Sequence, residues 1–175
     1  NIKSDLGRIY NSADKYVQKI VIPSRKEIKY ILLWRPSDIS EIEEVTAKGG
    51  NWILLIKSAT NVLKGDNFVF VYPELLENKI IVRGGEIITS EIFDREDLNY
   101  KNINSKIKSL LRKTTDKIKS RGSIVNEITT RGDFVKKIRD SVQLNQNIKY
   151  RLEVVSLKDS KTADSIIVEL NIFKL

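Results

Sequence analysis

Cysteine and histidine are both absent from this chain, and the two absences restrict the chemistry that it can carry out. Without cysteine there is no disulfide, no thiolate nucleophile and no thiolate ligand for a metal. Without histidine, the usual general base near neutral pH and the commonest metal ligand are missing. Zinc hydrolysis and Ser-His-Asp or Cys-His catalysis are therefore excluded within this chain, and only carboxylate or lysine chemistry stays open. We expect a non-enzymatic protein with no cofactor and no metal.

Long apolar runs are also absent, and no segment approaches the ~20 residues that a membrane-spanning helix needs. We therefore expect no transmembrane segment within the chain, and no signal peptide is visible. The first residue is Asn1 rather than Met, so we expect a chain that was processed or trimmed. The composition is that of a globular protein, with 41% hydrophobic and 31% charged residues. A length of 175 residues predicts one domain, 1–175, in which 101–145 can form a helical subregion.

The charge is one-sided, because 31 basic against 23 acidic residues give a formal net charge of +8. Such an excess favours anionic partners, although lysine also serves solubility. Most of the excess lies in 101–121, where Asp116 is the single acidic residue. The candidate site for nucleic acid or another anionic partner consists of the eight basic residues of this segment: Lys101, Lys106, Lys108, Arg112, Lys113, Lys117, Lys119 and Arg121.

The same segment has the apolar spacing of an amphipathic helix, which Gly122 ends. Its apolar face consists of Ile103, Ile107, Leu110, Leu111, Thr114 and Ile118. On a helical wheel, one flank holds Lys106, Lys113 and Lys117, and the other side holds Lys101, Lys108, Arg112 and Lys119.

Three interpretations of this helix stay open. It contacts phosphates without reading a base sequence, it binds an acidic lipid surface or an acidic protein, or it is a core helix whose solvated face is rich in lysine. The basic stretch contains no aromatic residue, which argues against a surface that stacks single-stranded bases.

The remaining pattern predicts an α+β fold. Apolar spacing predicts an N-terminal helix over 2–20, and alternation predicts a mainly antiparallel sheet within 27–92. Basic helices are expected over 103–145. A C-terminal β-hairpin is expected over 148–173, because apolar and polar residues alternate in both of its strands.

Short-range signals mark several boundaries within this fold. Asp38 is expected to cap a short helix, because a glutamate follows it three residues later. Gly84-Gly85 predicts the turn of a hairpin between two short strands. Asp133 is expected to cap the last helix. The polar stretch 158–164 is expected to turn the C-terminal hairpin.

Two short motifs have a functional and a structural interpretation. The tripeptide Arg131-Gly132-Asp133 is read by some adhesion receptors, but Asp133 also suits a helix cap. The order Asp-Glu-x-Lys of metal-dependent nucleases occurs at Asp14, Glu27 and Lys29. Because this order is common by chance, we favour partly exposed ion pairs over a magnesium site.

The opening of the chain resembles a known class of surface proteins. A tyrosine-bearing amphipathic helix, Arg8-Ile9-Tyr10-Asn11 through Tyr16-Val17, runs into Ile20-Val21-Ile22-Pro23 and then into a strand. In this outline, residues 2–34 are similar to soluble domains of archaeal and bacterial pilin-like surface proteins. The resemblance implies an exposed location and a hydrophobic helix half that precedes such domains. It does not predict the basic helix over 103–121.

These observations favour a non-enzymatic structural or assembly subunit of a surface appendage, an envelope or a virus particle. Its expected partners are other protein subunits, and we expect an extracellular, envelope or virion location rather than the cytoplasm. The alternative is a basic nucleic-acid-binding module that uses helix 103–121. A nucleic acid, an acidic lipid or an acidic protein would then bind the cations of 101–121.

Overall fold

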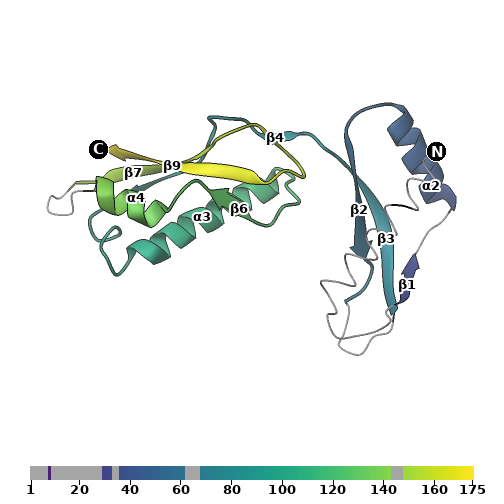
Figure 1. Ribbon diagram of the computed structural model, residues 1–175, viewed down its shortest axis with the longest axis horizontal. Coiled ribbons are helices and arrows are strands. Elements are labelled where there is room, and N and C mark those ends of the chain that lie inside the picture. Colours follow the sequence, from purple (N-terminus) through teal and green to yellow (C-terminus); the bar gives the residue numbers. More distant parts are fainter. Residues whose placement is uncertain (1–7, 9–28, 33–35, 62–67, 143–147) are drawn as a thin grey trace. The chain divides into compact units, whose positions relative to one another are not determined.

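The computed structural model describes residues 8, 29–32, 36–61, 68–142 and 148–175 (Figure 1). Of the predicted N-terminal helix only Arg8 is described, in helical conformation, and the rest lies outside the described residues. The described residues form helices and mainly antiparallel sheets, which confirms the predicted α+β class.

The chain divides into two compact units, Asn1–Glu77 and Asn78–Leu175, where the sequence predicted one domain. Each unit has hydrogen-bonded sheets of its own. The division has a physical reason, because strands of the predicted sheet 27–92 pair within different units. The helical region 101–145 belongs to unit 2, the name used below for residues 78–175.

The first unit contains a three-stranded sheet in the order β1-β3-β2. Its elements are β1 (Lys29–Leu32), α2 (Pro36–Ala47), β2 (Trp52–Ser58) and β3 (Phe68–Glu77). Strands β2 and β3 are antiparallel, whereas β1 runs parallel to β3. Helix α2 begins at Pro36, two residues before the predicted cap Asp38, because the fixed backbone of proline suits the first position of a helix.

Unit 2 contains a four-stranded sheet in the order β5-β7-β9-β6 and a small sheet of β4 and β8. Its strands are β4 (Ile80–Val82), β5 (Ile87–Phe93), β6 (Ile128–Thr130), β7 (Tyr150–Ser156), β8 (Ser160–Lys161) and β9 (Ile166–Lys174). Its helices are α3 (Ile103–Ser120) and α4 (Phe134–Ser141). Strands β5, β7 and β9 are mutually antiparallel, and β6 runs parallel to β9.

The predicted hairpin around Gly84-Gly85 is wrong in its pairing, although the turn itself forms. Gly85 has a φ of +79°, and the amide of Glu86 donates to the carbonyl of Arg83 at 3.1 Å. The two strands then separate, because β4 pairs with β8 and β5 pairs with β7. The described residues within 27–92 therefore contribute to three sheets rather than one.

Two predicted helix boundaries in unit 2 are confirmed, the end of α3 at Gly122 and the start of α4 at Asp133. The expected helical region 103–145 also contains strand β6, and α4 ends at Ser141. Helix α3 is followed by Gly122 at a φ of +103°, a conformation that favours glycine. The Asp133 side chain accepts hydrogen bonds from the amides of Val135 and Lys136 at 2.9 and 3.1 Å. The C-terminal hairpin is also confirmed, with β8 lying inside its predicted turn.

The core of unit 2 lies between one face of the four-stranded sheet and the two helices, which lie on the same side of it (Figure 1). The sheet contributes Leu152, Val154, Val168 and Leu170, and the helices contribute Leu110, Ile118, Phe134 and Ile138. The buried Thr114 hydroxyl donates to the Leu110 carbonyl at 2.8 Å and also contacts the Thr89 hydroxyl. This satisfies the one polar side chain that α3 buries.

We expect Leu152→Ala to lower the free energy of unfolding of unit 2 by about 2–5 kcal/mol, because it leaves a cavity under α3. Leu152 is fully buried, whereas Ile92 is 61% exposed. The control Ile92→Ala should change that free energy by about 0.5 kcal/mol or less. Urea unfolding, followed by circular dichroism, measures both, and equal effects of the two substitutions would contradict this core.

Candidate anion-binding surface on helix α3

The rotation of α3 about its axis is set by the residues that it buries. Ile103, Ile107, Leu110, Thr114 and Ile118 face the sheet, as the sequence pattern predicted. Because successive residues turn by about 100°, the basic residues are distributed around the remaining surface in two groups. One group borders β5, and the other faces away from the sheet.

Three basic residues of the candidate site form ion pairs with carboxylates that precede the helix in sequence. Lys106 Nζ lies 2.6 Å from Asp97 Oδ1, and Lys113 Nζ lies 2.5 Å from Glu91 Oε1. At the helix end, Arg121 Nη1 lies 2.6 Å from Glu86 Oε1. The pairs are nested along the sequence: Asp97 and Lys106 lie between Glu91 and Lys113, which in turn lie between Glu86 and Arg121. This order arises because α3 runs back alongside β5. The basic pattern of the sequence did not predict these partners, although the nested order of acidic and basic residues was a signal for them.

Two of these ion pairs shift the pKa values of Glu86, Asp97 and Lys106. The pKa of Glu86 lies below its ordinary value of 4.5, first because the Arg83 amide donates to it and then because Arg121 does. The hydrogen bond from Lys106 lowers the pKa of Asp97 below 3.8. The same bond raises the pKa of Lys106 above 10.5. These side chains are therefore charged at neutral pH and neutralise one another.

The second group consists of Lys108, Arg112 and Lys119, which share the side of α3 that faces away from the sheet. All three side chains are exposed, and none forms an ion pair with a described residue. We call these three residues the cationic stripe. Its ends are eleven positions apart in the sequence, so it extends about 16 Å along the helix.

The two other predicted cations lie outside the stripe. Lys101 was assigned to the same side as Lys108, but it lies in the turn before α3, where its amide donates to Asn99 Oδ1 at 3.0 Å. Lys117 is exposed and close enough to Glu86 to lower the pKa of that carboxyl. The candidate site therefore separates into neutralised cations beside β5 and an unpaired stripe facing away from the sheet.

The charge around the stripe belongs to unit 2 as a whole. Residues 78–175 contain 20 basic and 13 acidic side chains, so they carry nearly all of the excess charge. Asp116 lies on the same side of α3 and weakens the local field, since it is four residues after Arg112. On the neighbouring helix, Lys136 is exposed, and Arg139 stacks on Tyr100 at 5.1 Å.

The opposite face of the four-stranded sheet, which we call the outer face, differs in character. The strand register places three rows on it: Ile87, Val155 and Glu169; Ser90, Glu153 and Asn171; Ile92, Arg151 and Phe173. Arg151 Nε pairs with Glu153 Oε1 at 2.9 Å and stacks on Phe173 at 5.2 Å. Glu169 lies 4.0 Å from Arg131. The outer face is therefore close to neutral, and Ile87, Ile92 and Phe173 are exposed on it.

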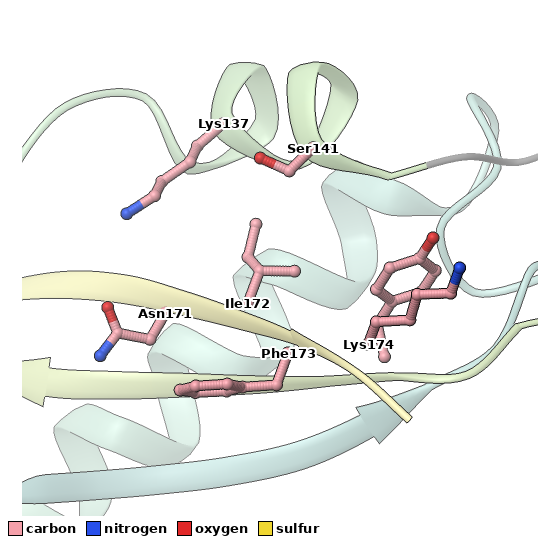
Figure 2. Close-up of a pocket in the computed structure, with 7 residues that line it drawn as sticks. Lys137, Ser141, Asn171, Ile172, Phe173 and Lys174 are labelled. Atoms are coloured by element: carbon pink, nitrogen blue, oxygen red, sulfur yellow. The ribbon is translucent and has the colours of Figure 1, made fainter.

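A shallow pocket of about 460 Å³ lies between α4 and the end of β9 (Figure 2). It is lined by Lys137, Ser141, Tyr150, Asn171, Ile172, Phe173 and Lys174. Lys137 and Lys174 are the two cations among these residues, and the Lys137 amine already donates to the Leu170 carbonyl at 2.5 Å. The pocket therefore offers an anion fewer cations than the cationic stripe does.

The other sequence motifs have local structural roles where they are described. Asp133 of the Arg-Gly-Asp tripeptide caps α4, as its alternative interpretation predicted. In the segment between β5 and α3, Asp94 Oδ1 accepts hydrogen bonds from the amides of Glu96 and Asp97, which orders a turn. Asp14 and Glu27 lie outside the described residues, and Lys29 begins β1. Among the described residues, no three acidic side chains gather as a metal site would require.

We expect the stability of unit 2 to fall as the pH drops below about 4.5, because Glu86 has a lowered pKa in the folded chain. A lowered folded-state pKa adds stability that is complete above the ordinary value and is lost as the pH falls through the folded value. Glu86→Gln should therefore lower the unfolding free energy at pH 7 and flatten its dependence on pH below 4.5. Urea unfolding across this range tests the expectation, with the exposed Glu127→Gln as control; identical pH profiles for the two variants would contradict it.

Comparison of the chain with protein-family models, with curated protein sequences and with solved structures finds no match. The assignment of a role therefore depends on the surfaces described above. In the described part of the chain, none of the helices has the length and apolar character required to cross a lipid bilayer.

Proposed function

We propose that this protein is a non-enzymatic subunit of a larger protein assembly and that unit 2 binds a neighbouring subunit. The observation that carries the proposal is the outer face, where Ile87, Ile92 and Phe173 are exposed beside charges that are already paired. Both helices of unit 2 lie on the other face of the sheet (Figure 1). Exposed apolar side chains on a sheet face that no described helix covers are compatible with a surface that binds another protein.

The charge of the outer face supports a protein as its partner. Arg151 is held between Glu153 and the ring of Phe173, so its guanidinium loses little freedom when a partner covers it. Aromatic and arginine side chains are enriched at the centres of protein interfaces. The absence of histidine and cysteine supports a binding role over a catalytic one. The resemblance of residues 2–34 to pilin-like surface proteins favours a surface, envelope or virion setting.

A nucleic-acid-binding role is the second candidate, and the cationic stripe favours it. Lys108, Arg112 and Lys119 are exposed, unpaired within the described residues and aligned along one helix. Such a row suits contacts with successive phosphates, which would bind without reading the base sequence. The stripe and the outer face lie on opposite sides of the sheet, so the two roles are compatible.

We expect the purified chain to associate with itself reversibly, and Phe173→Lys to raise the dissociation constant at least ~10-fold, because it places a charge in the outer face. Sedimentation velocity over a range of about 1 to 500 μM measures this association. Tyr100→Lys is the control, because it changes an exposed aromatic residue on the helical side. A chain that stays monomeric throughout contradicts the proposed assembly role.

If the stripe binds nucleic acid, replacing Lys108, Arg112 and Lys119 with Glu should abolish binding to duplex DNA and RNA. The wild-type log–log dependence of affinity on salt should have a slope of about −3 from these contacts. A control replaces Lys79, Lys149 and Lys158 with Glu, which makes the same charge change away from α3. Equal losses in both variants, measured by fluorescence anisotropy, would contradict a specific role of the stripe. Retained binding to acidic vesicles alone would indicate a lipid partner instead.

A further inference from the structure

The two edges of the four-stranded sheet are protected to different degrees. At the β6 edge, the outermost strand has only three residues, and β9 continues beyond it. There the Val168 carbonyl accepts from the Arg131 amide at 2.7 Å, and the Leu170 carbonyl accepts from Lys137 Nζ at 2.5 Å. A very short edge strand and a lysine at the edge are common means of preventing a sheet from pairing with another chain.

The β5 edge lacks these forms of protection. Strand β5 has seven residues, Ile-Ile-Thr-Ser-Glu-Ile-Phe, and none is lysine, arginine or proline. Within the described part of the chain, β7 is its only neighbour in the sheet. An irregularity between Ile87 and Thr89 disturbs the start of the strand, but the remaining register from Thr89 to Phe93 is regular.

The alternation of the ladder shows which backbone groups of β5 point outward. The carbonyls of Val168 and Leu170 point toward the β6 edge, so the backbone groups of the residues between them in β9 form hydrogen bonds with β7. Because hydrogen-bonding direction alternates along each strand, β5 forms its backbone hydrogen bonds with β7 through Thr89, Glu91 and Phe93. The amides and carbonyls of Ser90 and Ile92 therefore point away from β7. The Ile92 side chain is 61% exposed beside them.

The charges next to β5 identify the partner that fits this edge. The three nested ion pairs neutralise Lys106, Lys113 and Arg121 on the flank of α3 that borders β5 and leave Lys117 as the exposed cation there, whereas the cationic stripe faces away from the sheet. A second copy of unit 2 carries the same positive excess and is repelled where cations are unpaired. It meets little repulsion at the β5 edge, where most cations are paired and the backbone groups of Ser90 and Ile92 are ready for hydrogen bonding.

We propose that β5 pairs antiparallel with β5 of a second copy, about a two-fold axis near Ser90 and Glu91. This inference rests on the proposed assembly role and adds the β5 edge to the outer face as a contact between copies. Ser90 and Ile92 of each copy exchange backbone hydrogen bonds with the other copy, which joins two four-stranded sheets into one. The same surface is used by both copies, as a two-fold interface requires.

The test compares Ser90→Pro and Ile92→Lys with the wild-type full chain by sedimentation velocity. Proline removes only an outward-pointing amide and leaves the bonds to β7 intact, and lysine adds a charge at an exposed edge position. Each substitution should raise the dissociation constant of the dimer at least ~10-fold. Ile80→Lys is the matched control, because Ile80 is 48% exposed and lies outside β5; it should leave the constant unchanged.

Hydrogen exchange on the wild-type chain gives a second measurement that does not depend on the folding of a variant. The amides of Ser90 and Ile92 should exchange more slowly at concentrations where the dimer forms than in dilute monomer. Association that survives both substitutions, with no such slowing, overturns the β5 contact and leaves the assembly role standing. A chain that never associates overturns both.

Discussion

The burial of the apolar stripe of α3 against the four-stranded sheet is the constraint on which the other features of unit 2 depend. Leu110 and Ile118 are excluded from water only when the helix has one rotation about its axis. That rotation places Lys106 and Lys113 beside the carboxylates that flank β5 and turns Lys108 toward solvent. Surface ion pairs add little energy individually, so they follow the packing of the helix rather than determine it.

Helices and turns of unit 2 could be predicted from sequence because their signals are local. Gly122 and Asp133 mark helix ends through backbone conformation and hydrogen bonds within a few residues. The pairing of β4 and β5 could not be predicted, because Gly84-Gly85 specifies a turn but not the partners of the strands beyond it. For the candidate site, the sequence predicted the positions of the cations around α3. It did not reveal which were neutralised, since that depends on a distant strand.

The two sides of the four-stranded sheet of unit 2 carry different kinds of surface side chains. The helical side carries the unpaired cations, and the outer face carries exposed apolar groups with paired charges. A polyanion gains nothing from the neutral face, and an apolar partner is disfavoured by the charged one. In a dimer joined at β5, both cationic stripes would therefore lie on the same side of one continuous sheet.

The order of strands in the sheet has a consequence for how the chain folds. Strands β7 and β9 occupy the middle of the sheet, yet they follow β5, α3, β6 and α4 in sequence. During synthesis, the apolar side of α3 consequently emerges before the strands that cover it. Long-range pairing of this kind slows folding and prolongs the exposure of unpaired strands. A nascent chain that stops short of residue 150 would contain the edge strands β5 and β6 but not the central strands β7 and β9 that connect them.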